Sequence, residues 1–193
     1  MIKRIIKENP TSQSQSPTPK PKENKYNIKV AICTVAKNEN QYALEWINYY
    51  RDLGVDKIFL YDNNLAESSE RFIDVLKEEV DKGFVEIYDH THVVGNTFQI
   101  TSYGDCYNRH RNEFDWFFIV DFDEFLYFNH DIELKKFLTM PNFNQCNAIR
   151  ISWLPMTDSG LVHYDPRPVL ERFTEPFVCG IDSIYTRFGK SLF

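Results

Sequence analysis

The chain has 193 residues, of which 42% are hydrophobic and 16% aromatic, enough to bury the core of one domain. Its net charge of −6 argues against nucleic acid as the main partner. No stretch reaches the roughly 18 to 20 apolar residues of a membrane span. The four cysteines are far apart and form no C-x-x-C pair, so we expect free thiols in a reducing compartment rather than a zinc site.

Residues 1–27 differ in composition from the rest and predict a disordered basic tail. Residues 11–22 are Ser, Gln, Thr, Pro and Lys, a composition that cannot bury enough surface to order itself. Seven Lys or Arg and two Glu in residues 1–29 give this part a charge of +5, which leaves −11 on the remainder. The folded domain is therefore expected over residues 28–193.

Three isoleucines and three basic residues lie within residues 1–7. A weak contact with an anionic membrane surface is one interpretation of this pattern, and a solvated terminus is the other. No apolar core of a signal peptide follows. We therefore expect the protein in the compartment where it is made, the cytoplasm, with at most a peripheral contact at the inner face of the membrane.

Strand and helix patterns alternate from residue 28 onward. β-branched and apolar residues predict a strand over 28–36, and Tyr42 and Trp46 begin an apolar repeat at helical spacing that Gly54 ends. The same reasoning predicts strands over 57–61, 84–88 and 116–120, a helix opened by Ser68 or Ser69 and closed by Gly83, and a helix over about 97–113. This alternation predicts an α/β fold, a doubly wound and mostly parallel sheet with helices on both faces.

The strand over 116–120 is followed directly by the carboxylates Asp121, Asp123 and Glu124. A short apolar run of this kind indicates a strand buried on both faces, and open α/β sheets bind ligands at the carboxyl ends of such strands. In an extended chain Asp121 and Asp123 point the same way, and a cation between them relieves their repulsion. Mg²⁺ or Mn²⁺ suits this site, with a plain acidic turn as the alternative.

The regular alternation of strands and helices weakens after this strand. The pattern predicts a short helix over 131–138 and a strand over 147–154. From Pro155 the alternation is lost, and several prolines and scattered charges indicate long loops, where substrate sites are often built.

Polar side chains near the ends of three predicted strands are expected at one edge of the sheet. They are Thr34, Lys37, Asn38 and Glu39 from the first strand, Asp62, Asn63 and Asn64 from the second, and Asp121, Asp123 and Glu124 from the fourth. A nucleotide fits this arrangement, with Asp62 accepting hydrogen bonds from a ribose hydroxyl or a base N–H. A plain turn is the alternative for Asp62 and its neighbours, because Asp and Asn favour turns.

Four segments occur in an order that resembles a known family: residues 36–39, 45–55, 59–63 and 116–126. Together they resemble the family 92 glycosyltransferases and their family 2-like bacterial relatives, over about residues 30–193, and Arg172-Phe173 and Lys190-Ser191-Leu192 also look like this family. The resemblance implies a GT-A fold, a nucleotide-sugar donor such as a UDP-sugar, and Mn²⁺ or Mg²⁺ held by Asp121 and Asp123. It also implies a saccharide or lipid-linked glycan acceptor, and a domain that is incomplete at its C-terminus.

The implied chemistry is displacement at the anomeric carbon of the sugar, with inversion. A basic side chain is expected to add positive charge beside the diphosphate, and the candidates are Arg109, His110 and Lys37. For Arg109 and His110, a solvated position on a helix surface is an equally good interpretation. An inverting enzyme needs a general base for the acceptor hydroxyl, for which Asp158 and Glu171 are candidates and Glu124 is less favoured.

Two other functional interpretations remain open at this point. Phosphohydrolases of the haloacid dehalogenase type also place Asp-x-Asp after a buried strand and use the first Asp as nucleophile. Their motif normally continues with Thr or Val where this chain has Phe125, and it lies near the chain start rather than after three strands. The second interpretation is a truncated, non-catalytic domain that binds a nucleotide sugar.

Removing residues 1–27 is expected to leave the melting temperature of the remaining chain unchanged, because residues 11–25 contain no side chain typical of a core. Thermal melting of the full and the shortened chain measures this. A decrease of more than a few degrees on deletion would show that the tail packs against the domain.

Overall fold

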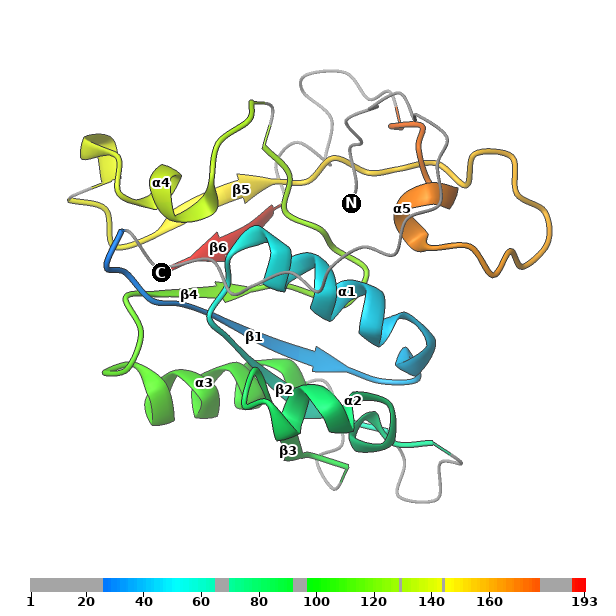
Figure 1. Ribbon diagram of the computed structural model, residues 1–193, viewed down its shortest axis with the longest axis horizontal. Helices are drawn as coiled ribbons and strands as arrows, with labels where there is room; N and C mark the ends of the chain where they lie inside the picture. Colours follow the sequence, from blue (N-terminus) through cyan, green and yellow to red (C-terminus); the bar gives the residue numbers. More distant parts are fainter. Residues whose placement is uncertain (1–25, 65–69, 92–96, 129, 144, 178–188) are drawn as a thin grey trace, which may run out of the picture.

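Figure 1 shows the computed structural model, which describes residues 26–64, 70–91, 97–128, 130–143, 145–177 and 189–193. These residues form a six-stranded sheet in the order β3-β2-β1-β4-β6-β5. Its strands are β1 (Val30–Ala36), β2 (Lys57–Asp62), β3 (Val85–Asp89), β4 (Trp116–Ile119), β5 (Ile149–Ser152) and β6 (Gly189–Leu192). The helices are α1 (Asn40–Leu53), α2 (Phe72–Asp81), α3 (Phe98–His110), α4 (Leu134–Leu138) and α5 (Val169–Arg172), with a 3₁₀ helix at Pro141–Phe143.

The sheet is mostly parallel. Strand β1 pairs in parallel with β2 and β4, and β2 pairs in parallel with β3. Strand β6 runs in the opposite direction, since it pairs antiparallel with both β4 and β5. The predicted doubly wound α/β fold is therefore confirmed, and the carboxyl ends of β1, β2, β3 and β4 meet at one edge of the sheet.

Alternate residues of the central strands face opposite layers, as the two-residue period of a strand requires. Val30 and Ile32 of β1 pack into the larger core with buried residues of α1 and α2. Ala31 and Cys33 face the other way, into a smaller core with Cys106 of α3. In Figure 1, α1 and α3 lie on opposite sides of β1, which confirms the prediction of helices on both faces.

Several predicted element boundaries are too wide by one to three residues. The strand expected over 28–36 begins at Val30, and the helix expected over 97–113 covers Phe98–His110. The elements expected over 131–138 and 147–154 shorten in the same way, to Leu134–Leu138 and Ile149–Ser152. The flanking residues have apolar neighbours, but their backbone groups bond elsewhere: the N–H of Lys29 donates to the Asp115 carboxylate at 2.7 Å.

The beginning of α2 differs from the prediction. Ser68 and Ser69, expected to open this helix, lie outside the described residues. The helix begins at Phe72, with Arg71 at the N-cap position. The N–H of Arg71 donates to the Asp74 carboxylate over 3.0 Å, which satisfies one of the free backbone donors at this end.

Strand β6 was not predicted, because its sequence Gly-Lys-Ser-Leu has only one strongly apolar side chain. The strand forms through its neighbours: Leu192 pairs with Phe118 of β4 on one side and with Ile149 of β5 on the other, and it is buried. This pairing brings the polar residues of β6 beside the end of β4.

No helix in the part of the chain that the structure describes is both long and apolar enough to cross a membrane. Among the described cysteines, Cys33 and Cys106 are buried free thiols and Cys146 is an exposed one, while Cys179 lies outside the described residues.

Gly189→Ala is expected to lower the free energy of unfolding by about 1–3 kcal/mol, the usual cost of overpacking. A Cβ at Gly189 would overlap the carbonyl oxygen of Ile151 on strand β5. Gly104→Ala is the matched control, because a Cβ on this exposed residue of α3 meets nothing within 4 Å. Alanine in a helix is expected to add about 0.5–1 kcal/mol. Urea denaturation measures both, and equal effects would contradict the close approach of β5 and β6.

Candidate functional site

The three carboxylates after β4 lie on a β-turn. Strand β4 ends at Ile119, and the N–H of Glu124 donates to the carbonyl of Asp121 over 3.1 Å. The Glu124 carboxylate accepts a hydrogen bond from the N–H of Asp121 over 3.0 Å. The prediction that Asp121 and Asp123 belong to an extended chain is therefore wrong, because these two bonds turn the chain. Residues 121–124 are called the acidic turn below.

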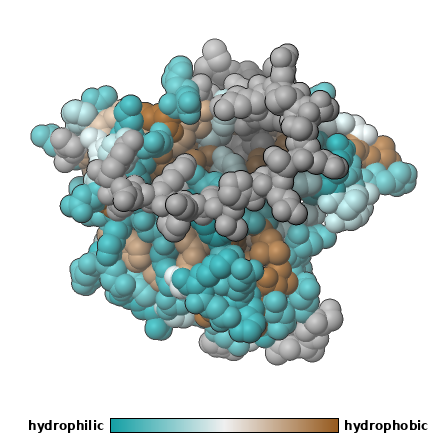
Figure 2. All heavy atoms as spheres, in the orientation of Figure 1, coloured by the Kyte–Doolittle hydropathy of each residue, from teal (hydrophilic) through white to brown (hydrophobic). Residues whose placement is uncertain are grey.

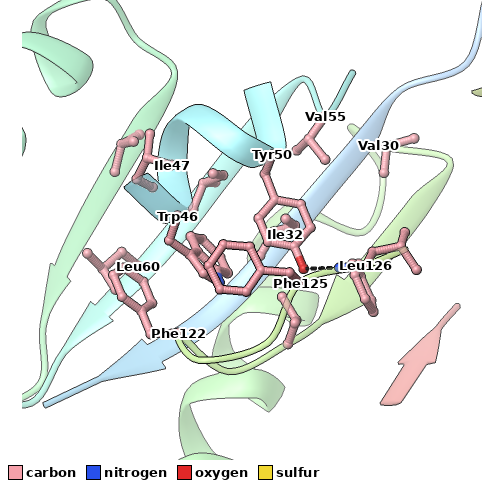
Figure 3. Close-up of a cluster of buried hydrophobic side chains, with 14 of the residues drawn as sticks. Val30, Ile32, Trp46, Ile47, Tyr50, Val55, Leu60, Phe122, Phe125 and Leu126 are labelled. Carbon is pink, nitrogen blue, oxygen red and sulfur yellow. Dashed lines mark hydrogen bonds between the residues drawn. The ribbon is translucent and has the colours of Figure 1, made fainter. Parts of the chain in front are cut away.

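Trp46 of α1 binds the backbone of the acidic turn, and Figure 3 shows it beside Phe122 of that turn. Its indole Nε1 donates to the carbonyls of Asp121 and Glu124, over 3.2 and 2.9 Å. Its ring stacks on Phe122 with 4.5 Å between ring centroids. Both aromatic rings are buried, so the two carbonyl groups find their donor inside the protein rather than in water.

Two tyrosines of α1 fix the residues that follow. The Tyr50 hydroxyl donates to the carbonyl of Glu124 and accepts from the N–H of Leu126, both over 3.1 Å. The Tyr49 hydroxyl donates to the carbonyl of Leu126 over 2.6 Å. Helix α1 thus satisfies the carbonyls of Asp121 and Glu124 and both backbone groups of Leu126, while the Glu124 carboxylate satisfies the N–H of Asp121.

The Asp121 carboxylate binds side chains from two distant parts of the chain. Lys190 of β6 places Nζ 2.6 Å from Asp121 Oδ2 and 3.5 Å from Glu124 Oε2. The hydroxyl of Tyr103 on α3 donates to Asp121 Oδ1 over 3.2 Å. Burial and the charge of Asp121 raise the pKa of Tyr103 well above its usual value, so Tyr103 stays a donor at neutral pH.

A fourth carboxylate, Glu39, shares the electrostatic environment of the acidic turn. Burial raises the pKa of Glu39, and the negative charges of Asp123 and Asp121 raise it further. Burial also raises the pKa of Glu124, and the same two aspartates contribute to the increase. Carboxylates that repel one another in this way favour a positively charged ligand among them.

The donor chemistry of the acidic turn fits Mg²⁺ or Mn²⁺. Both ions take oxygen ligands, and Mg²⁺ commonly binds one or two carboxylates, with substrate phosphates and water completing its shell. Within the described ranges, no three His, Cys, Asp or Glu side chains already converge as a metal cage. In the structure Lys190 supplies the positive charge beside Asp121.

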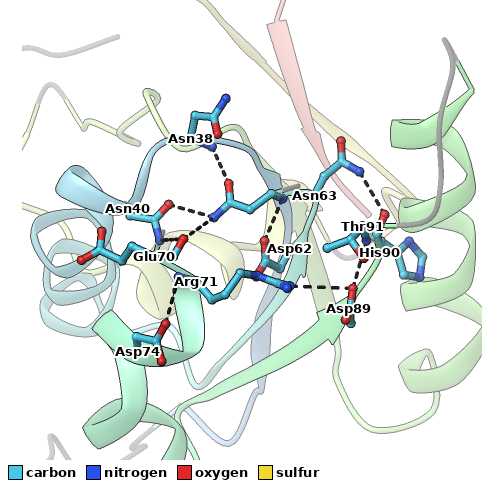
Figure 4. A network of polar contacts seen from close by, with 11 residues as sticks. Asn38, Asn40, Asp62, Asn63, Glu70, Arg71, Asp74, Asp89, His90 and Thr91 are labelled. Carbon is cyan, nitrogen blue, oxygen red and sulfur yellow. Dashed lines mark hydrogen bonds and ion pairs between the residues drawn. The ribbon is translucent and has the colours of Figure 1, made fainter. Parts of the chain in front are cut away.

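Asp62 lies in a buried polar network at the end of β2 (Figure 4). Arg71 binds its Oδ2 through Nε at 3.0 Å and through Nη2 at 2.9 Å, and the N–H of Asn64 donates to Oδ1 over 2.9 Å. The Asn64 side chain accepts from the N–H of Asn38 over 2.6 Å and donates to Asn40 Oδ1 over 2.9 Å. This network joins the ends of β1 and β2 to the starts of α1 and α2. The ribose contact of Asp62 stays a prediction.

The other residues predicted for the nucleoside pocket differ in their exposure. Thr34 is fully buried in β1, and its hydroxyl has no hydrogen-bond partner among the described residues. Lys37 and Asn38 are exposed at the end of β1, where Asn38 adopts a left-handed conformation with φ +59°. Asn63 donates from its side chain to the carbonyl of His90 over 2.9 Å and so joins the ends of β2 and β3.

Arg109 and His110 lie in a separate cluster against edge strand β3. Arg109 Nε is 2.6 Å from Asp105 Oδ2, and its guanidinium lies 5.3 Å from the centroid of the Tyr88 ring. His110 Nε2 is 2.9 Å from the Tyr88 hydroxyl. Strand β3 is three positions from β4 in the sheet, or about 14 Å at the usual strand spacing. The structure does not bring these two side chains to the acidic turn.

Both candidate bases lie in the segment between β5 and β6. Asp158 is exposed, and its Oδ1 accepts a hydrogen bond from the N–H of Gly160 over 3.0 Å. Glu171 is exposed on α5. Helix α5 docks onto α1, because the Glu45 carboxylate accepts hydrogen bonds from the first two N–H groups of α5, over 2.8 and 3.0 Å.

Sequence reasoning missed four contributors to this edge of the sheet: Trp46 as a hydrogen-bond donor, Tyr103, Arg71 and Lys190. The helical repeat identified Trp46 only as part of an apolar face. Lys190 lies in a segment noted for its resemblance to the family, and this segment was the signal that could have identified it.

Trp46→Phe is expected to lower the free energy of unfolding by about 1–3 kcal/mol, because the carbonyls of Asp121 and Glu124 lose a buried donor. Trp116→Phe is the control, since it makes the same change on strand β4. Urea denaturation of both variants measures the difference, and equal losses would contradict a special role for Trp46.

The sequence is similar to that of known proteins over the strands and helices that form this site. Residues 26–157 match the family model of glycosyltransferase family 92. The chain is 28% identical over 152 residues to a family 92 protein of Ricinus communis, which covers 76% of this chain and 26% of that protein. It is 32% identical over 108 residues to a family 92 protein of Arabidopsis thaliana, a match that covers 55% of this chain and 18% of that protein. It is 29% identical over 111 residues to a family 92 protein of Oryza sativa subsp. japonica, a match that covers 56% of this chain and 18% of that protein.

The chain thus spans about a quarter of the length of the Ricinus relative and under a fifth of the other two. The family match begins four residues before β1, ends in the loop after β5 and includes the acidic turn. Because this match covers more than half of the sequence, the chain belongs to glycosyltransferase family 92.

Proposed function

We propose that this chain contains the donor-binding part of a glycosyltransferase, which transfers a sugar from a UDP-sugar to a saccharide or lipid-linked glycan acceptor. The observation that carries the proposal is the acidic turn, fixed by Trp46 at the carboxyl end of β4 and paired with Lys190. Family membership supports glycosyl transfer as the reaction class. The chain spans only part of its relatives, so the acceptor and the complete reaction are proposed for the whole protein.

Asp121 and Asp123 are the residues that would hold Mn²⁺ or Mg²⁺ in this site. When bound, such an ion supplies positive charge that stabilises the departing diphosphate. Lys190 adds a second positive charge at the same place, since its ammonium already lies between Asp121 and Glu124. Tyr103 keeps the Asp121 carboxylate in one orientation through its hydrogen bond to Oδ1.

Inversion requires the acceptor oxygen to bond to the anomeric carbon from the side opposite the diphosphate. The bond between that carbon and the diphosphate oxygen breaks, its electron pair leaves with the diphosphate, and a base takes the hydroxyl proton. Asp158 and Glu171 are exposed carboxylates suited to this role. Glu124 is less suitable, because its carboxylate already accepts the N–H of Asp121 and lies near Lys190.

We place the reaction in the cytoplasm, with a weak peripheral contact between residues 1–7 and an anionic membrane surface. Basic and apolar residues alternate there, as expected for such a contact, but residues 1–25 lie outside the described part of the chain.

Asp123→Asn is expected to reduce UDP-sugar hydrolysis at saturating Mn²⁺ by more than tenfold, which corresponds to a barrier increase above about 1.4 kcal/mol. Asparagine keeps the shape of this exposed side chain but removes the charge that would hold the ion. Asp81→Asn is the matched control, an equal loss of charge on the exposed surface of α2. The variant and the control are assayed against a panel of nucleotide sugars, with thermal melting to verify the fold.

More than a tenth of the wild-type rate in Asp123→Asn would contradict the role of Asp123. Calorimetry of UDP binding with Mn²⁺ and with EDTA supplies the second measurement, and equal affinity in both would contradict the metal. Metal-dependent UDP binding without hydrolysis by the wild-type chain would favour the non-catalytic alternative.

A further inference from the structure

Arg172 of α5 is a buried cation that lacks a hydrogen-bonded anion within the described residues. Arg172 is only 7% exposed, and its Nε is buried without a hydrogen-bond partner among the described residues. Arg167 binds the nearby Asp165 carboxylate, with 2.9 Å between Arg167 Nε and Asp165 Oδ2, and lowers its pKa; the charge of Arg172 lowers that pKa further but Arg172 makes no hydrogen bond to it. A buried guanidinium whose Nε–H finds no acceptor is costly, and an anionic ligand would supply that acceptor.

Three aromatic rings surround the guanidinium instead. The ring centroids of Phe173, Tyr42 and Tyr164 lie 5.0, 5.6 and 5.9 Å from its central carbon. Such rings orient a guanidinium plane while leaving its N–H fork free to bind a carboxylate or phosphate with two parallel hydrogen bonds. Tyr164 is itself 68% exposed, so one ring of this aromatic box is open to solvent.

The surface beside the box is suited to a sugar. Val162, two residues before Tyr164, is also exposed, and Figure 2 shows apolar surface at the right-hand end of the molecule, where Figure 1 places the loop between β5 and α5. An exposed aromatic ring next to apolar surface can stack on the C–H face of a sugar ring.

The box lies at the same edge of the sheet as the acidic turn. Tyr42 is in the first turn of α1, one helical turn before Trp46, which binds the acidic turn. Glu45 of the same helix fixes α5 by accepting hydrogen bonds from the N–H groups of Val169 and Leu170. A ligand in the box therefore lies beside the proposed donor site rather than on a remote surface.

We infer that Arg172, with Tyr42 and Tyr164, binds an anionic saccharide, a sugar that carries a carboxylate or a phosphate, as the acceptor of the reaction. The guanidinium donates hydrogen bonds to the anionic group, and the Tyr164 ring stacks on the sugar. The role as acceptor rests on the proposed function, whereas the binding of the anionic sugar does not.

Nuclear magnetic resonance titrations without nucleotide or metal test the binding. The probes are glucuronate, glucose 6-phosphate, neutral glucose and inorganic phosphate. We expect at least one charged sugar to bind ten or more times as tightly as glucose and as inorganic phosphate, and the tighter of the two identifies the anionic group. Equal binding of glucose overturns the anion site, and equal binding of inorganic phosphate overturns the recognition of a sugar.

Arg172→Met is expected to weaken binding of the charged sugar at least tenfold, whereas Arg111→Met, at an exposed arginine at the end of α3, leaves it unchanged. Equal losses in the two variants overturn the inference. Tyr164→Ala changes an exposed residue and is expected to weaken binding of the charged sugar but not of inorganic phosphate.

Circular dichroism verifies that each variant folds. If Arg172→Met does not fold, Tyr164→Ala and the wild-type preference decide the question, and an unchanged affinity in Tyr164→Ala overturns the inference. A wild-type chain that binds the charged sugar but shows no metal-dependent binding of UDP would contradict the proposed function and leave this site intact.

Discussion

The hydrogen bonds from α1 to the backbone after β4 are the constraint on which the site depends. Where β4 stops pairing, the carbonyls of Asp121 and Glu124 are enclosed by protein and need donors. Trp46 and Tyr50 supply them from one face of α1. The helix satisfies these carbonyls, the Glu124 carboxylate satisfies the N–H of Asp121, and the Asp121 carboxylate pairs with Lys190.

Strand β6 then balances the charge of the acidic turn. It enters the sheet antiparallel between β4 and β5, and this position brings Lys190 within 2.6 Å of Asp121 Oδ2. Lys190 thereby neutralises charge at the end of β4, about seventy residues before it in the sequence. The same edge is ordered further along by Arg71 and Asp62, whose buried ion pair joins the end of β2 to the start of α2.

The two sides of this edge differ in how completely their charges are satisfied. On the side of β1, β2 and β4, carboxylates have basic or hydroxyl partners, as Asp62 has Arg71 and Asp121 has Lys190. On the side of α5, Arg172 is surrounded by aromatic rings. In the proposed function the first side holds the donor and the second gains its anion from the acceptor, which would bring the two substrates together.

The sequence by itself determined the layers. Continuous apolar runs indicate strands buried on both faces, the helical repeat around Trp46 indicates the buried face of α1, and burial drives their packing into an α/β sheet. The apolar run before Asp121 likewise located the acidic residues at a strand end. Only the tertiary structure decided that these residues form a turn, that Asp62 pairs with Arg71, and that Lys190 reaches Asp121. Periodicity encodes which side of an element avoids water, but the partner of a polar side chain depends on residues far away in the chain, which no local pattern specifies.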